Sequence, residues 1–374
     1  MKRLTEFDIT ELQDPSFSQA VIDWQKAHGR HALPWQNTRD AYRIWLSEIM
    51  LQQTQVTAVL GYYARFLERF PTVDALAEAP LEDVMAHWSG LGYYTRARNL
   101  HACAKRVVAD YGSVFPSDPA LLAELPGIGR STAAAIAAFS SGARAAILDG
   151  NVKRVFARVF GVDQYPGLKP VEDALWRRAE ALLPEGPEGG GIEAYTQGLM
   201  DLGATLCTRG KPDCARCPLQ ARCVAYATDR TATLPVPKPK KATPEKRALM
   251  LAVVDAGQVL LQQRPESGIW GGLLSLPEFD GHVALDEADA IDASTLAGAA
   301  GEFGEVVEAE PLLPLVHGFT HYRLHIQPWR IALARRADTP AGHVWWDLDR
   351  IPDAPLPAPI KKLLEQLGRP TLFA

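Results

Sequence analysis

The sequence predicts an all-α domain followed by an α+β domain, joined by a short extended linker. The chain has 374 residues, of which 47% are hydrophobic, so it can build more than one core. This composition excludes disordered, collagen-like and disulfide-stapled chains. Apolar residues recur at helical spacing through the first part of the chain, whereas strand-like alternation begins only near residue 248.

Helices are expected from about Trp24 to Cys207. Apolar residues recur at near-helical spacing over 44–60, 100–108 and 152–159, and Gly112 is placed to end the second of these helices. Turns that contain Gly or Pro separate the segments, and no strand alternation interrupts them. We therefore expect residues 1–230 to form an all-α domain.

Residues 231–247 hold four prolines and five basic residues against one acid. Proline denies a helix its hydrogen bonds, so this segment is expected to be an extended linker, and its charge would also suit a passage near DNA. Beyond it, residues 248–264 predict two strands with a turn at 255–257, and 321–333 and 341–348 predict further strands. With a short helix at 360–367, residues 248–374 are expected to form an α+β domain.

The net charge of −5 argues against a polyanion partner when the chain is taken whole, but the charge is unevenly distributed. Residues 1–230 carry a net charge of −1, the linker +4 and the remainder −8. The chain shows no signal peptide and no apolar run of the ~18 residues that a membrane-spanning helix needs. We expect a cytoplasmic protein without a membrane partner.

Four of the five cysteines crowd into one segment, Cys207-x6-Cys214-x2-Cys217-x5-Cys223. In a reducing compartment this spacing indicates a metal site rather than disulfides. Four thiolates could hold zinc or a [4Fe–4S] cluster, and the single CxxC pair favours iron–sulfur over zinc. The lone Cys103 is expected to be a small buried apolar residue.

The segment LPGIGRSTA (125–133) has two glycines that suit a tight turn before a helix start. Gly127 and Gly129 would leave backbone amides open to a phosphate, and Ser131 would enter the helix. A glycine pair alone is often an ordinary turn. With the Leu-Pro before it and the Ala-rich helix after it, the segment resembles the helix–hairpin–helix motif, which binds the DNA backbone without reading its sequence.

Two carboxylates are candidates for acid–base chemistry. Asp149 precedes a helix and could be only its N-cap. Glu48 sits among apolar neighbours, where burial would raise its pKa and keep it a proton donor near neutral pH. The polar run 52–55 follows Glu48 and is interpreted as a helical face suited to nucleotide contacts.

These motifs carry a family resemblance. The chain resembles the endonuclease III-like superfamily of helix–hairpin–helix DNA glycosylases and, more closely, its adenine DNA glycosylase (MutY) family. The matching segments follow in family order over most of residues 30–225: LPWQ (33–36), WLSEIMLQQTQV (45–56), GLGYYTRARNLH (90–101), LPGIGRSTA, ILDGNVKR (147–154) and the four-cysteine loop. The C-terminal part is similar to the Nudix-like domain of that family over 264–279 and 317–326. It lacks the REXXEE run of Nudix hydrolases, so the resemblance implies the fold without pyrophosphatase chemistry.

The resemblance also implies a finer division of the chain. It predicts a six-helix barrel at about 33–142, a cluster subdomain from 1–32 plus 143–230, the linker at 231–247 and an 8-oxoguanine recognition domain at 248–374. The cofactor implied is one [4Fe–4S] cluster on the four cysteines.

The resemblance assigns chemistry to four residues. Glu48 would protonate a flipped adenine at N7, Asp149 would stabilise an oxocarbenium-like sugar, and Asn151 would orient that site. Ser131 stands where bifunctional relatives carry a Schiff-base lysine, so strand cleavage is not expected.

The resemblance also implies contacts with DNA. Gln53 and Tyr93 would insert into the duplex when the base flips out. The adenine pocket would contain Trp35, Leu51 and Gln197, and 8-oxoguanine would be recognised by Phe319, Thr320 and His321. The family has Ser at the position of Thr320, and the hydroxyl is retained.

The predicted function is therefore a monofunctional glycosylase that removes adenine opposite 8-oxoguanine or guanine in double-stranded DNA. Such a protein is expected to be a monomer that is associated with the nucleoid through DNA. Three alternatives remain open from the residues: a bifunctional pyrimidine-lesion glycosylase with lyase activity, a non-catalytic DNA-binding iron–sulfur protein, and a nucleotide hydrolase acting through the second domain. Ser131 and the C-terminal domain argue against the first of these.

Overall fold

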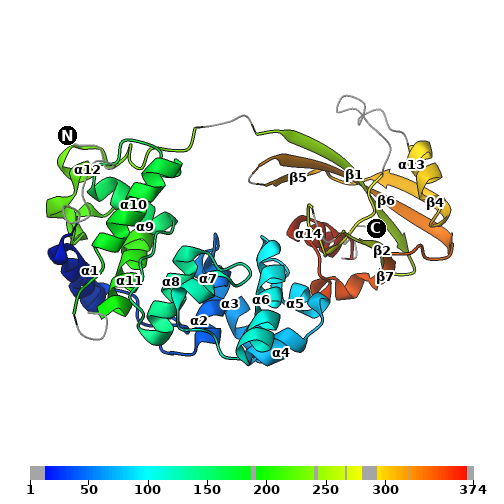
Figure 1. Cartoon of the computed structure of the whole chain (residues 1–374). Helices are drawn as coiled ribbons and strands as arrows, with labels where there is room; N and C mark the ends of the chain where they lie inside the picture. Colours follow the sequence, from blue (N-terminus) through cyan, green and yellow to red (C-terminus); the bar gives the residue numbers. More distant parts are fainter. Residues whose placement is uncertain are drawn as a thin grey trace. The chain divides into compact units, whose positions relative to one another are not determined.

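A computed structural model of the chain describes residues 13–186, 191–239, 243–265, 268–279, 293–319 and 321–368. The chain divides into two compact units (Figure 1). Unit 1 contains Met1–Glu78 and Asn99–Lys240, and unit 2 contains Ala79–Arg98 and Lys241–Ala374. No described helix is long and apolar enough to cross a membrane.

Unit 1 is helical, and its described residues contain no strand, which confirms the predicted all-α class. Its elements are α1 (Pro15–His28), α2 (Ala41–Leu51), α3 (Val56–Arg69), α4 (Val73–Glu78), most of α6 (Thr95–Tyr111), α7 (Pro119–Ala123), α8 (Arg130–Ser141), α9 (Gly150–Val159), α10 (Lys169–Ala181), α11 (Ile192–Asp201), a π-helical turn η4 (Leu202–Leu206), the short turns η5 (Cys214–Arg216) and η6 (Gln220–Arg222), and α12 (Val224–Ala227).

Local sequence signals set the ends of these helices. Asp14, Asp40, Asp118 and Asp149 each accept a hydrogen bond from a backbone amide in the first turn of the following helix, which satisfies one of its unpaired donors. As predicted, α6 ends before Gly112, whose φ of 58° lies in the left-handed region that favours glycine.

The expected helix over 44–60 is two helices, and the polar run 52–55 is the turn between them, so its interpretation as a helical face was wrong. Gln53 takes a left-handed backbone conformation with φ of 59°, which ends α2, and α3 starts again at Val56. Among the apolar residues of the predicted pattern, Ile49 and Val59 are buried on either side of the turn, whereas Leu60 is exposed.

One hydrophobic core of unit 1 is built mainly by α1, α8, α9, α10 and α11. Phe17 of α1 meets Phe156 of α9 edge to face, with ring centroids 5.9 Å apart. Helices α1 and α11 lie side by side (Figure 1), and Gly198 allows their close approach because a Cβ there would lie 2.7 Å from Val21. This packing fixes α9 and α11, which carry candidate site residues.

Unit 2 contains a seven-stranded sheet with the order β3-β2-β1-β6-β4, in which β5 also pairs with β6 and β7 with β2. All pairings are antiparallel except that of β1 with β6. The strands are β1 (Glu245–Asp255), β2 (Gln258–Gln263), β3 (Leu274–Ser275), β4 (Gly304–Pro311), β5 (Leu315–Gly318), β6 (Arg323–Arg336) and β7 (His343–Asp347). The helical elements of the unit are α5 (Leu81–Trp88), the start of α6, α13 (Ala293–Ala300), η8 (Leu348–Asp353) and α14 (Ala358–Leu367).

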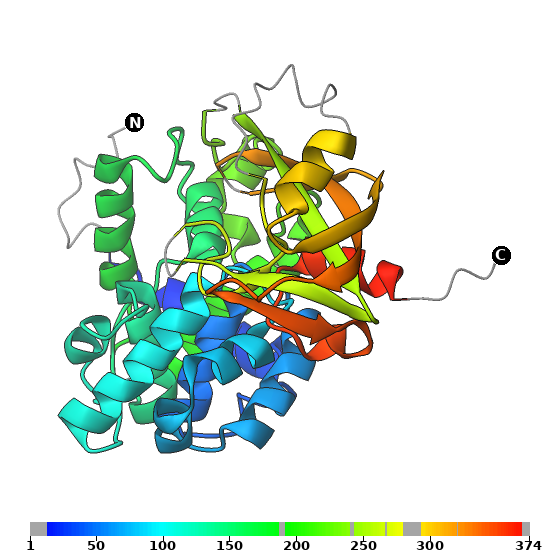
Figure 2. The same ribbon diagram turned by 90° about the vertical axis from the view of Figure 1, so that its right-hand side faces the viewer.

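The sheet confirms the predicted α+β class. The predicted turn joins β1 to β2, with positive φ at Ala256 and Gly257. Helix α13 lies beside β4 in both views (Figures 1 and 2), and its Leu296 packs on Leu251 and Ile331 of the central strands. Strand β1 begins at Glu245, inside the segment predicted as linker, and β3, β4 and β5 were not predicted.

Candidate active site

A cavity of about 500 Å³ opens in unit 1 beside α2 and α11. It brings together three predicted site residues, Glu48, Trp35 and Gln197. Leu51, which was predicted for the same pocket, is not among the residues that line it. The lining also includes residues that the sequence analysis did not assign, among them Gln25, Arg30, His31, Gln36, Arg39 and Glu193.

Glu48 lies on α2 between buried residues of the same helix and faces the cavity. Burial, together with the negative charge of Asp149, raises the pKa of Glu48 to about 8. Its carboxyl group is therefore mainly protonated at neutral pH. A neutral carboxylic acid that borders a cavity can act as a proton donor.

Asp149 is the N-cap of α9, as its simpler interpretation predicted, and its carboxylate accepts a 2.8 Å hydrogen bond from the amide of Val152. Burial raises the pKa of Asp149, whereas the amides of Val152 and Asn151 and the charge of Arg154 favour its ionised form. The N-cap role does not exclude a role in a reaction, because the hydrogen bond to Val152 leaves further lone pairs on the carboxylate.

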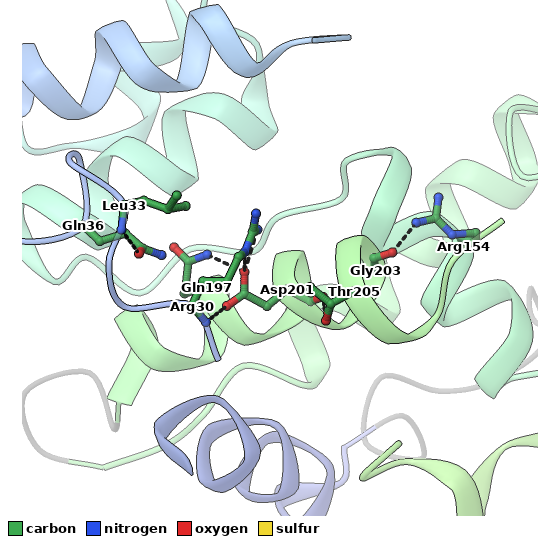
Figure 3. Close-up of polar contacts among 8 residues, drawn as sticks. All are labelled: Arg30, Leu33, Gln36, Arg154, Gln197, Asp201, Gly203 and Thr205. Carbon is green, nitrogen blue, oxygen red and sulfur yellow. Dashed lines mark hydrogen bonds and ion pairs between the residues drawn. The ribbon is translucent and has the colours of Figure 1, made fainter. Parts of the chain in front are cut away.

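Asn151 belongs to a hydrogen-bond network that centres on Arg154. The Arg154 guanidinium donates to Asn151 Oδ1 at 2.7 Å, to the Gly203 carbonyl at 2.7 Å and to the Cys207 carbonyl at 2.7 Å. Figure 3 shows the contact with Gly203, which lies in η4. The network joins the start of α9 to the first cysteine of the four-cysteine loop.

The other walls of the cavity come from the loop before α2 and from α11. Trp35 is buried and packs edge to face on Tyr63, with ring centroids 5.2 Å apart. Gln197 lies on α11 and donates from Nε2 to Asp201 Oδ1 at 2.9 Å, and Arg30 also bonds to Asp201 (Figure 3). The sequence analysis missed Arg30 and Asp201, because no local pattern links residues 171 positions apart.

The predicted glycine hairpin lies between α7 and α8. Gly127 has a φ of 77°, and a Cβ there would lie 2.8 Å from the Asn99 Cβ. Among the described residues, the amides of Gly127 and Gly129 have no hydrogen-bond partner. Ser131 accepts a 3.0 Å bond from the amide of Leu148, so it supports the segment that leads into Asp149.

The two residues predicted to enter the duplex share one backbone feature. Gln53 in unit 1 and Tyr93 in unit 2 both take left-handed conformations, with φ of 59° and 51°. Such conformations are costly for residues other than glycine and are concentrated at functional sites. Both side chains are exposed, and that of Tyr93 keeps 47% of its surface accessible.

Within unit 2, Tyr93 lines a second cavity of about 730 Å³ together with the predicted Phe319 and His321. Phe319 stacks on Tyr322 at 4.7 Å and lies 5.8 Å from Trp270, between ring centroids. The walls are thus aromatic and suited to a planar base. Thr320 lies outside the described residues.

The four cysteines of the predicted metal site, Cys207, Cys214, Cys217 and Cys223, line one pocket in unit 1. Arg158 donates a hydrogen bond to Cys207 Sγ at 3.3 Å. Burial raises the pKa of Cys217 to about 11. Among the described residues, no group of three or more His, Cys, Asp or Glu is arranged around a single-ion site. Cys103 is buried, as predicted.

Comparisons with known proteins agree with this geometry. Residues 46–181 match the HhH-GPD superfamily of base excision DNA repair proteins, and residues 248–366 match the NUDIX domain. The solved structure of a thermostable thymine-DNA glycosylase is 31% identical and has a TM-score of 0.52, covering 59% of this chain and 100% of its own.

Relatives that align over nearly the whole chain identify the family more narrowly. The adenine DNA glycosylase of Buchnera aphidicola subsp. Schizaphis graminum is 34% identical over 352 residues, which cover 93% of this chain and 98% of that protein. The adenine DNA glycosylase of Homo sapiens is 30% identical over 417 residues, which cover 95% of this chain and 74% of that protein. The chain therefore belongs to the adenine DNA glycosylase family of base excision repair enzymes, monofunctional hydrolases of N-glycosidic bonds in DNA.

Proposed function

We propose that Glu48 is the general acid and Asp149 the charge-stabilising carboxylate of adenine release. The observation that carries this proposal is the raised pKa of Glu48, to about 8, beside Asp149 and a cavity. Two neighbouring carboxyl groups in different environments can divide acid and anionic roles. Burial raises the pKa of Asp149, but the capping hydrogen bonds and the nearby cationic groups oppose this rise, so we assign the proton to Glu48.

The reaction is a hydrolysis and includes no redox step. As the bond between C1′ and N9 breaks, its electron pair moves to the base, and Glu48 delivers its proton to N7. The sugar becomes electron-deficient, and the Asp149 carboxylate stabilises it. Water then adds hydroxide to C1′, and its second proton restores Glu48. Asn151, held by Arg154, orients the anionic side of the site.

Ser131 bears no amine, so it forms no Schiff base with the sugar, in keeping with hydrolysis without strand cleavage. Its hydroxyl accepts a hydrogen bond from the amide of Leu148 and so supports the backbone just before Asp149. Gly127, Gly129 and the start of α8 are proposed to bind DNA phosphates through unpaired amides.

We infer that the mispair partner of the adenine is 8-oxoguanine or guanine, read in unit 2. The aromatic cavity of Tyr93, Phe319 and His321 supports this proposal. The test is single-turnover adenine release opposite 8-oxoguanine, guanine, cytosine and thymine. We expect the fastest release opposite 8-oxoguanine and the slowest opposite thymine. Phe319→Ala should lower the 8-oxoguanine preference, whereas equal rates opposite all four bases contradict this assignment.

The donor set of four cysteines fits a [4Fe–4S] cluster, which accepts four thiolates. Cys207, Cys214, Cys217 and Cys223 would hold it, and it would supply structural support to the loop that bonds to Arg154. Purified protein should be brown, with about four irons and four sulfides per chain. Colourless protein with one zinc per chain would refute the assignment.

A further inference from the structure

We propose that Asp201 is a positioning residue that turns the Gln197 carbonyl toward the cavity. With the amide nitrogen of Gln36, this oxygen forms an acceptor–donor pair that selects an amino group at position 6 of the purine. The proposal rests on the assignment of the unit 1 cavity as the base pocket, and it adds two specificity-determining residues, Gln36 and Asp201.

Asp201 is fully buried, and its carboxylate is surrounded by donors. Gln197 Nε2 donates to it at 2.9 Å, Arg30 Nε at 2.7 Å and the Arg30 amide at 2.8 Å. An ionised carboxylate only accepts hydrogen bonds, so the amide nitrogen of Gln197 must be the end that faces it. The Gln197 oxygen consequently points away from Asp201, as Figure 3 shows.

Gln36 is oriented in the opposite sense. The amide of Leu33 donates to Gln36 Oε1 at 3.1 Å, which fixes the oxygen and leaves the nitrogen as the free end (Figure 3). Gln36 Nε2 is buried and has no hydrogen-bond partner among the described residues. A buried donor without a partner is costly, and its position in the cavity lining indicates that a ligand acceptor satisfies it.

The pair matches adenine and opposes a 6-oxopurine. Adenine offers an amino donor at N6 to Gln197 Oε1 and an acceptor at N1 to Gln36 Nε2, while N7 remains for Glu48. Hypoxanthine offers O6 and a protonated N1, so acceptor would meet acceptor and donor would meet donor. Sites that leave buried polar groups unpaired reject the wrong substrate strongly.

The experiment compares single-turnover release of adenine and hypoxanthine opposite the same base in one duplex. In Asp201→Asn the new amide can donate, so Gln197 is free to reverse. We expect the ratio of adenine to hypoxanthine rates to fall about tenfold or more, chiefly because hypoxanthine release rises. In Gln36→Glu an acceptor replaces the donor, and we expect the ratio to fall again.

The matched control is Asp255→Asn, which breaks a comparable bond to Arg336 in unit 2 and should leave the ratio unchanged. A structural role for Asp201 alone would slow both substrates by the same factor, which would overturn the proposal. So would an unchanged ratio in Gln36→Glu. Failure of the proposed acid assignment would give a different result. In that case Glu48→Gln would still release adenine at the full rate, while the ratio of adenine to hypoxanthine rates would still shift in the Asp201 and Gln36 variants.

Discussion

The negative charge of Asp149, the N-cap of α9, acts on the carboxyl group of Glu48 on α2 and adds to the burial that raises its pKa to about 8. The two residues are 101 positions apart in the sequence, and the helical packing of unit 1 brings their charges into range. In the proposed assignment, Glu48 keeps its proton at neutral pH and Asp149 is the anion.

Activity should depend on pH through Glu48. The acid must be protonated, so kcat/KM is expected to fall about tenfold per pH unit above pH 8, where Glu48 ionises. Asp149→Asn removes the repelling charge and should lower the pKa of Glu48, measurable by NMR with ¹³C-labelled glutamate. A rate that stays level to pH 10 would exclude Glu48 as the acid.

Replacing Glu48 should raise the stability of the protein although it removes the proposed acid. The pKa of Glu48 is about 8 in the folded protein against 4.5 ordinarily, so between these values the unfolded state releases a proton that the folded state retains. The wild type therefore loses stability as pH rises through this window. Glu48→Gln cannot titrate, and since a pKa difference of one unit corresponds to about 1.4 kcal/mol, we expect it to be more stable by about 4 kcal/mol at pH 8. Denaturant unfolding at pH 8 and pH 4.5 tests this, since the advantage should shrink at the lower pH.

Arg154 should affect both the rate of base release and the binding of iron by the four-cysteine loop. Arg154→Gln removes bonds to Asn151, Gly203 and Cys207, and we expect base release to slow by about tenfold or more and iron content to fall. Arg144→Gln is the matched control, because among the described residues Arg144 bonds to the carbonyls of Leu183 and Pro184 and to no residue of the site. Equal effects of the two substitutions on rate and iron would contradict the network.

The hairpin glycines offer a matched pair. Gly127→Ala introduces a Cβ at a φ of 77° and 2.8 Å from Asn99 Cβ, so we expect a loss of about 1–3 kcal/mol in stability and weaker DNA binding. Gly129 has an ordinary φ of −86° and open space at its Cβ position, so Gly129→Ala should fold normally. Denaturation and filter binding measure the two effects, and equal loss of stability in both variants would argue against backbone strain at Gly127.

Much of the architecture could be predicted from local signals. Helical spacing and Gly112 predicted α6, the Asp255–Gly257 turn predicted the β1–β2 hairpin, and the cysteine spacing indicated one shared pocket. The turn at 52–55 was mispredicted because its residues are neither Gly nor Pro, and the left-handed Gln53 leaves no local signature.

The rest of the site depends on tertiary contacts that no periodicity encodes. Asp201 contacts Arg30 although the two residues are 171 positions apart in the sequence. Gln36 lies in the LPWQ segment, and no sequence pattern marks its amide nitrogen as unpaired. Strand β4 escaped prediction because its exposure does not alternate cleanly, with two register shifts against β6.

The most direct test of the central claim is single-turnover adenine release by Glu48→Gln from a duplex with adenine opposite 8-oxoguanine, measured beside its DNA affinity. The account predicts that release falls by about a thousandfold or more while affinity stays within a few fold of wild type. Adenine release by Glu48→Gln at the wild-type rate, with unchanged DNA affinity, would contradict the account.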